Sequence, residues 1–488
     1  MHLRLVLVAS LLTAPTLAAF RCSAKGGASW REYRTAHFVI DTDAGAGDVQ
    51  NLVRQLERMH VLVLQALVGE QVEIPGRVRV LAFNDQTDFI EMAGQGIAAY
   101  YMRGLLGEPS IVLPIRKAWE SPETVAHEFA HHLSFFLFPV QQSWFTEGLA
   151  EWVQTVAARP GETATFNTGS HIARGTNVMS GSVAGGIPNN LKGWLQKDTP
   201  PIPAKQLFAW DGEESGGTAG TGHFSSWMLY HWLWNQRSKP FADYQKRLAD
   251  SGDPEAAWRS AFPEFDPSSA EGLAKLDAEL DRYRTGGRFA FYKVQAEGDS
   301  RFSEAAISSS DLHLLLVGAR SSWPSKSERE QAIRAAYDEA AAEDPASPVA
   351  QYFQMKSAEK MDVTTLRAAV NARPTDWRGW LVLGEETKEE TALRKAVELN
   401  PQSAKAQNDL AWLLATSGRA REALPIANRA LDLAPWDASI VDTLAEVAAR
   451  LGKCAEARVL EKRAVASRPT DDMRKRHAEI EARCSAPK

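Results

Sequence analysis

The sequence predicts two parts of different structural class: an α+β domain over residues 20–300 and an all-α helical solenoid over residues 327–488. Short β-rich runs precede the helical patterns in the first part, as is typical of an α+β domain. From about residue 327 the strand signals end and a regular Ala–Pro pattern begins. A chain of 488 residues has room for about two to three domains, so this division is reasonable.

The strands of the α+β part are expected at three β-rich runs, 37–42, 77–83 and 110–115. Helices are expected where apolar residues recur at three- and four-residue spacing, at 48–67, 121–138, 146–158 and 223–236. A stretch rich in Gly, Ser, Thr and Asn, roughly 160–222, separates the last two helices. A loop of this length either lines a cleft or is a plain surface insertion, and both remain open.

The solenoid is predicted from an internal repeat. An alanine followed five residues later by proline recurs at Ala340/Pro345, Ala369/Pro374, Ala396/Pro401, Ala430/Pro435 and Ala464/Pro469. Gly384, Gly418 and Gly452 are 34 residues apart, as expected for turns between paired helices. This period resembles the tetratricopeptide (TPR) repeat, most clearly over 402–469; a generic helical bundle is the alternative. Residues 301–326 are a linker or remain unassigned.

The first 19 residues have the pattern of a secretory signal peptide. Arg4 precedes an apolar run from Leu5 to Leu17, and Ala18 and Ala19 supply small residues for cleavage. An N-terminal anchor or buried helix is the alternative, although the run is short for a bilayer span. We therefore expect a secreted or periplasmic protein with no membrane segment after the signal is removed.

The charge balance argues against nucleic-acid partners. The formal net charge is −6, from 55 Lys and Arg against 61 Asp and Glu. Basic residues do not form a cluster interleaved with aromatic ones, so we expect no nucleic-acid binding.

Three cysteines are too few for a disulfide scaffold. Cys454 is expected to begin the second helix of the last full repeat, and Cys484 to end the capping helix that follows. A disulfide between them would join the last helices of the solenoid covalently. Two free thiols are the alternative.

The segment His127-Glu128-Phe129-Ala130-His131 lies inside the helix expected at 121–138. Two histidines four residues apart share one helix face, which allows both imidazoles to bind one zinc ion. Glu128 is placed to act as the base for a zinc-bound water. A satisfied core histidine would explain either histidine alone but hardly the whole motif.

Downstream, Trp144-Phe145-Thr146-Glu147-Gly148-Leu149-Ala150 is followed by Glu151. Together with the HExxH motif, this segment resembles the gluzincin metallopeptidases, whose third zinc ligand is a glutamate on a following helix. The wider pattern is similar to peptidase MA-like proteins that carry TPR repeats. The resemblance implies a zincin-like fold, one Zn²⁺ held by His127, His131 and Glu147, and catalysis by Glu128. It also implies that Glu151 hydrogen-bonds the first zinc histidine, although by bare spacing Glu151 fits the third-ligand position better than Glu147.

Peptide hydrolysis also requires a donor for the tetrahedral oxyanion. The candidates are histidine and tyrosine side chains of the aromatic helix and the long loop, His223, Tyr230, His231 and His171, and structural packing is the alternative for each. The strand at 110–115 either offers an edge to an extended peptide substrate or lies within the sheet.

These features predict a secreted zinc-dependent peptidase whose TPR tail recruits a protein partner or substrate. One alternative is a non-catalytic TPR binding scaffold with a structural or degenerate zinc domain. Another is a zinc hydrolase that acts on amides other than peptides.

Overall fold

The structure is a computed structural model that describes residues 27–68, 73–116, 120–156, 170–171, 183–184, 187–191, 194–195, 199–212, 220–286, 288–289, 292–293, 296–323, 325–466 and 470–485. The predicted signal peptide, Cys22 and most of the stretch 160–222 lie outside the described residues.

A six-stranded mixed sheet is the centre of the first part, in the order β10-β1-β2-β3-β5-β4. Its strands are β1 (Arg31–Arg34), β2 (Phe38–Thr42), β3 (Val78–Phe83), β4 (Tyr100–Arg103), β5 (Pro109–Pro114) and β10 (Ser303–Ala306). The three strands predicted from the sequence, β2, β3 and β5, are parallel neighbours, and the others add to them antiparallel. The unassigned segment 301–326 therefore supplies the outer strand β10 and, after it, helix α12.

Both faces of the sheet are covered, which explains the nearly continuous apolar runs of β3 and β5. On one face, Val80, Ala82 and Leu113 pack with helices α1 (Ala46–Val68) and α4 (Pro122–Leu137). On the other face, Leu81 and Phe83 pack with helices α2 (Gln86–Ala93) and α12 (Ser309–Ala319).

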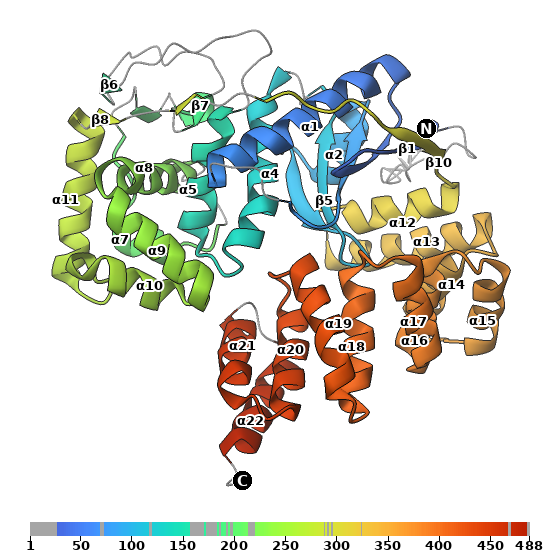
Figure 1. Cartoon of the computed structure of the whole chain (residues 1–488). Coiled ribbons are helices and arrows are strands. Elements are labelled where there is room, and N and C mark those ends of the chain that lie inside the picture. The colour runs from blue at the N-terminus through green and yellow to red at the C-terminus, as the bar shows by residue number, and fades with distance from the viewer. Residues whose placement is uncertain are drawn as a thin grey trace, which may run out of the picture.

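A helical layer extends the first core beyond α4. Its members are α5 (Ser143–Val153), α7 (Ala204–Ala209), α8 (Thr221–Gln236), α9 (Ser238–Ser251), α10 (Pro254–Ala261) and α11 (Ala270–Gly286). Three short 3₁₀ turns, η2 (Gln154–Val156), η3 (Asn189–Leu191) and η5 (Pro263–Phe265), connect parts of this layer. The two-residue strands β6 (Ser170–His171) and β7 (Val183–Ala184) pair with β8 (Arg288–Phe289) and β9 (Tyr292–Lys293). Figure 1 shows this layer to one side of the sheet.

The second part is a chain of helical hairpins. Its helices are α13 (Lys326–Glu343), α14 (Pro348–Ser357), α15 (Val363–Ala372), α16 (Trp377–Thr387), α17 (Glu390–Leu399), α18 (Ala404–Thr416), α19 (Ala420–Leu433), α20 (Ala438–Arg450), α21 (Cys454–Ala466) and α22 (Asp471–Ser485). Each helix packs on the next one, and α14, α16, α18 and α20 begin successive hairpins (Figure 1). Fully buried alanines such as Ala411, Ala423 and Ala427 allow these close contacts. The arrangement is that of a helical solenoid.

The repeated glycines do not all serve the same purpose. Gly418 and Gly452 lie in turns with φ values of +84° and +75°, where a left-handed backbone favours glycine. Gly384 instead lies inside α16, and a Cβ there would be 2.7 Å from the Leu393 side chain. The turn after α16 is made by Lys388, with φ +56°. The sequence expectation of a turn glycine is therefore wrong for Gly384, whose small size permits close packing of α16 and α17.

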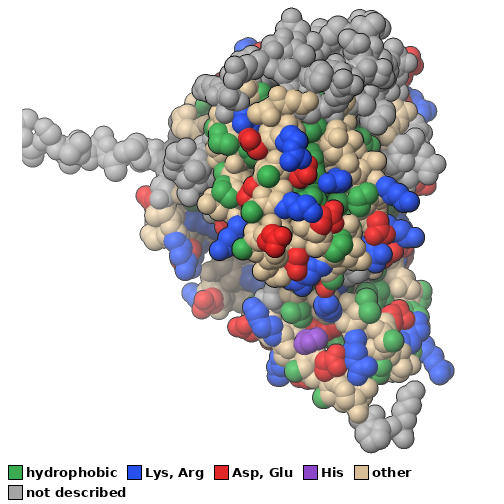
Figure 2. All heavy atoms as spheres, turned by 90° about the vertical axis from the view of Figure 1, so that its left-hand side faces the viewer, with side chains coloured by type: hydrophobic (Ala, Val, Ile, Leu, Met, Phe, Trp, Pro, Cys, Tyr) green, Lys and Arg blue, Asp and Glu red, His purple; other side chains and the backbone are tan. Residues whose placement is uncertain are grey.

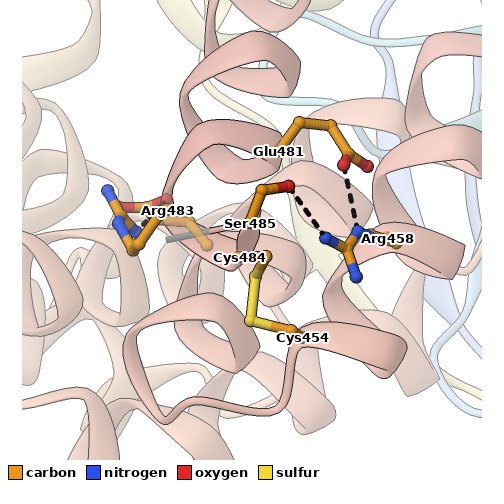
Figure 3. The surroundings of a disulfide bond; sticks show 7 residues. Cys454, Arg458, Glu481, Arg483, Cys484 and Ser485 are labelled. Carbon is orange, nitrogen blue, oxygen red and sulfur yellow. Dashed lines mark hydrogen bonds and ion pairs between the residues drawn. A yellow bond between two sulfur atoms is a disulfide. The ribbon is translucent and has the colours of Figure 1, made fainter. Parts of the chain in front are cut away.

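A disulfide joins Cys454, the first residue of α21, to Cys484 near the end of α22, with a Cα–Cα distance of 5.4 Å (Figure 3). Arg458 of α21 reinforces the same junction through Glu481 at 3.0 Å. The bridge resolves the alternative that the sequence left open for these two cysteines.

Basic and acidic side chains are interspersed over the face shown in Figure 2. This mixture matches the near balance of 55 basic and 61 acidic residues. Among the described residues, no helix combines the length and apolarity needed to cross a membrane.

Candidate metal centre

Helix α4 carries both histidines of the HExxH motif. It begins with Pro122 at its first position and ends at Leu137, two residues before Pro139. Ser121 is at the N-cap, but its side chain makes no capping hydrogen bond. The limits of the helix are close to the predicted range 121–138.

Helix α5 carries the third candidate ligand, Glu147. The helix begins at Ser143, three residues before the predicted start at 146. The Thr146 hydroxyl donates to the carbonyl of Gln142, 3.2 Å away, within the first turn. Glu147 consequently lies one turn inside α5, on the side that faces α4.

The imidazoles of α4 and the carboxylate of α5 converge on one point. Glu147 Oε2 is 3.2 Å from His127 Nε2 and 3.6 Å from His131 Nε2. Their potential ligand atoms all lie within 4.8 Å of one another, and each residue is partly buried. A two-histidine, one-glutamate donor set suits a catalytic zinc site, which keeps a fourth position for water or substrate.

The environment of Glu147 Oε2 supports this fit. The atom is buried and accepts no well-aligned hydrogen bond, although imidazole nitrogens lie close to it. A buried carboxylate oxygen without a hydrogen bond is costly. Nitrogen and oxygen atoms that approach closely without pointing at one another have the arrangement expected of donors directed at a shared cation.

The close approach of these three side chains also shifts their pKa values. Burial alone would lower the pKa of His127, but its close contact with Glu147 and the other nearby carboxylates raise that pKa to about 9. Burial lowers the pKa of His131 to about 4, and the charge on His127 adds to this effect. Burial opposes charging of Glu147, yet the surrounding imidazoles lower its pKa to about 2. Glu147 is thus held as an anion beside His127, and a cation would compete with the proton for these ligands.

Glu128 lies beside the three converging side chains. Its carboxylate accepts a hydrogen bond from the backbone N–H of Tyr101 in β4. Burial, followed by the charge on Glu147, raises the pKa of Glu128 to about 7. A carboxyl group with this pKa can both accept and release a proton near neutral pH.

Glu151 does not make the predicted hydrogen bond to His127. Its carboxylate accepts from Gln154 and from Asn190 Nδ2 at 3.1 Å, and it lies 3.5 Å from His223 Nδ1. The correction follows from the direction of α5, which turns Glu151 toward α8 rather than toward α4. Asn190 was not predicted, because nothing in its Gly-rich surroundings distinguishes it from other loop residues.

Of the candidate donors, His223 reaches the site. Its Nδ1 lies 3.3 Å from Glu147 Oε2, its side chain is 30% exposed, and the Trp210 ring packs against it. Burial alone would lower the pKa of His223, but Glu151 and Glu147 raise it.

Two other residues of α8 point away from the site. Tyr230 is buried between Phe145 and Phe241, and its hydroxyl accepts from Gln245 Nε2 at 3.3 Å. His231 is fully buried, with Nδ1 3.0 Å from the Tyr283 hydroxyl. Tyr230 and His231 are therefore packing residues, which was the alternative to a role as oxyanion donors. The side chain of His171 lies outside the described residues.

The edge of the sheet near the site is β4. Of the two alternatives for the strand at 110–115, an edge strand or an inner strand, the structure shows the inner one. That strand, β5, lies between β3 and β4, so it is an inner strand. Tyr101 of β4 donates its N–H to Glu128, which places the outer side of β4 against the candidate site.

Comparison with known proteins found no matching family model and no matching curated protein. Among solved structures, a thermophilic TPR protein of Thermus thermophilus is similar over 32% of this chain and 91% of its own length, with 22% identity. The TM-score of that match is 0.27, which is too low to carry an inference about this chain.

Proposed function

We propose that this chain is a zinc-dependent peptidase whose helical repeats bind a protein partner or substrate. The observation that carries the proposal is the convergence of His127, His131 and Glu147, with Glu128 beside them. A purely structural zinc site normally has four protein ligands, whereas the described residues offer three here and a neighbouring base.

His127 Nε2, His131 Nε2 and a carboxylate oxygen of Glu147 would hold the zinc ion. When bound, zinc lowers the pKa of a coordinated water toward neutrality and polarises a carbonyl group. Glu128 would accept the proton of the attacking water on its carboxylate and deliver it to the leaving amine. The Tyr101 N–H fixes the orientation of that carboxylate.

Strand β4 supplies a site for an extended peptide. It is the outermost strand of the described sheet at this end, and its outer side adjoins Glu128. An extended substrate would pair with β4 through backbone hydrogen bonds and place its scissile carbonyl at the centre. His223 is the described side chain best placed to donate a hydrogen bond to the developing oxyanion.

The N-terminal pattern supports secretion or export to the periplasm, where the Cys454–Cys484 disulfide would be stable. The hairpin array supports the alternative that the chain is a non-catalytic scaffold, because stacked helical repeats form extended protein-binding surfaces.

Metal content and hydrolysis of a peptide library, measured on the same preparations, test the proposal. We expect one zinc ion per chain in the wild type, and peptide hydrolysis that is lost when zinc is removed. The Glu128→Gln variant should keep zinc and lose activity by roughly 10²-fold or more, because the base is removed.

Two matched glutamate variants test the ligand assignment. Glu147→Gln should lose stoichiometric zinc because an amide is a poor zinc ligand, whereas Glu151→Gln should retain zinc. A wild type that binds zinc but hydrolyses no peptide would favour the scaffold or a hydrolase of other amides. A wild type that binds no zinc would contradict the proposal.

A further inference from the structure

The turn between α19 and α20 of the repeat array contains a buried tryptophan, Trp436. Its side chain is 6% exposed although it lies in a connecting turn. The ring packs edge-to-face on Phe136 with centroids 4.7 Å apart, and on His132 at 5.7 Å. Both partners belong to α4, so a repeat turn directly supports the helix that carries the candidate zinc ligands.

The contacts of Trp436 lie on the back of that helix. His131 and His132 are adjacent in sequence, but His131 faces Glu147 while His132 faces Trp436 and the ring of Tyr101. A displacement of α4 toward the repeat array would therefore move His131 away from Glu147. Because α4 carries both histidines, its position sets the distance between the imidazoles and the carboxylate on α5.

The same turn also holds strand β4, the other wall of the site. Arg103 of β4 lies over the Trp436 ring, 5.9 Å from its centre, and 3.8 Å from the carboxylate of Asp437. Tyr101 of β4 reaches α4 through its hydroxyl, which is 3.4 Å from His132 Nδ1. Its backbone N–H is the donor to Glu128. Trp436 thus contacts both the helix that supplies two ligands and the strand that orients the base.

We propose that Trp436 is a positioning residue for the metal centre, through which the repeat array holds α4 and β4 in the geometry that binds zinc. The inference rests on the proposed function for the identity of the centre. It adds that contacts from the repeat array fix the positions of α4 and β4 at the centre, so the repeats do more than recruit a partner.

Phe353 of α14 provides a matched control. It is a partly buried aromatic residue of the same array, and it packs on Tyr337 and Tyr352 rather than on α4. Phe353, His132, Phe136 and Trp436 all line one cavity of about 1440 Å³ between the two parts of the chain. Truncation of Phe353 therefore disturbs the same cavity without removing the contact to α4.

Zinc affinity of the full chain, measured by competition with a chromophoric chelator, tests the proposal. We expect Trp436→Ala to bind zinc about tenfold more weakly than the wild type, within the range seen when residues that support zinc ligands are lost. Trp436→Phe, which keeps an aromatic ring in the contact, should restore most of the affinity, and Phe353→Ala should leave it unchanged. The visible absorption bands of bound Co²⁺ should shift in Trp436→Ala alone, because its ligand geometry changes.

The outcomes separate this inference from the proposed function. Unchanged zinc affinity and an unchanged Co²⁺ spectrum in Trp436→Ala would overturn the inference and leave the peptidase proposal standing. Equal weakening in Phe353→Ala would also overturn it, because general loosening of the array would then be the cause. A wild type that binds zinc without hydrolysing peptides would overturn the peptidase proposal, while the effect of Trp436 on zinc binding would remain measurable. A wild type that binds no zinc would overturn both.

Discussion

Glu147 Oε2 and both carboxylate oxygens of Glu461 are buried atoms that lack well-aligned hydrogen bonds, and their surroundings give the two side chains opposite properties. Glu147 faces imidazole nitrogens, which lower its pKa and keep it charged. Glu461 of α21 is fully buried near the acids Asp442 and Glu446 of α20. A charged carboxylate beside imidazole nitrogens can bind a metal ion together with them. A carboxyl group beside other acids is more stable when it is protonated.

The protonation of Glu461 should make stability depend on pH. Burial, followed by the charge on Asp442, raises the pKa of Glu461 to about 7, while Arg476 of α22 lowers it. The pKa of Glu461 in the folded chain is above its ordinary value of about 4.3, so the folded state holds a proton on this group more strongly than the unfolded state. With respect to this group, the folded chain is therefore most stable below about pH 4.3. The free energy of unfolding falls as pH rises from there toward 7, by no more than about 1.4 kcal/mol per pH unit.

Thermal unfolding between pH 4 and 8 checks this prediction. The difference in unfolding temperature between wild type and Glu461→Gln should change across the window from about 4.3 to 7 and level off above it. Glu456→Gln, an exposed substitution on the same helix, should show no such change. A parallel pH dependence in wild type and Glu461→Gln would contradict the prediction.

At the scale of elements, the crossing of α5 and α8 decides which side chains reach the centre. Gly148 of α5 lies at this crossing, where a Cβ would be 2.5 Å from the Ser226 carbonyl oxygen and 2.8 Å from Tyr230 Cβ. The absence of a side chain lets α8 approach closely enough for His223 to reach Glu147 and Glu151. The glycine of the Glu-Gly-x-Ala segment therefore has a packing role beside the candidate ligand Glu147.

Gly148→Ala should destabilise the first part of the chain by about 1–3 kcal/mol, because the added methyl group meets backbone and forces the helices apart. It should also weaken zinc binding, since α5 carries Glu147. Gly47→Ala in α1 is the matched control, because a Cβ there meets nothing within 4 Å. We expect that control to be neutral or slightly stabilising in thermal unfolding. Equal stability of the two alanine variants would show that the α5–α8 crossing is not tight.

At the scale of the whole molecule, the repeat array follows an arc that returns to the first part of the chain. Helix α12 packs on the sheet, Trp436 packs on α4, and Lys462 of α21 lies 2.8 Å from Asp253 in the turn between α9 and α10. Residues of both parts line the cavity that lies between them. Beyond α21, helix α22 packs on α20 and α21 and is held there by the disulfide.

Loss of the disulfide should therefore act locally. The bridge spans 30 residues, and loop-closure entropy gives it a stabilising contribution of about 3–4 kcal/mol. In the double variant Cys454→Ser/Cys484→Ser, amide hydrogen exchange should accelerate in α22 and the adjoining part of α21 while α4 and α5 stay protected. Loss of protection throughout the chain would show instead that the array unfolds as one cooperative unit with the first domain.

Much of the architecture was predictable because its signals are local. The runs that became β2, β3 and β5 are apolar along their length, since both faces of the sheet are covered. Strands β1, β4 and β10 were missed because they are short and polar or only partly buried, and they pair by position rather than by composition. Helix spacing likewise placed His127 and His131 on one face before any tertiary structure was known.

The sequence by itself determined the pairing of the two histidines with Glu128, because all three lie on one helix whose geometry is local. It also determined the repeat period, whereas the pairing of Cys454 with Cys484 was decided by the structure. Between Glu147, which the motif favoured, and Glu151, which the bare spacing favoured, the structure brings Glu147 to the histidines. Tertiary structure alone decided that His223 faces the centre while Tyr230 does not, and that Trp436 lies behind α4. These outcomes depend on how separate helices cross and rotate about their axes, and that is set by packing between segments far apart in the chain.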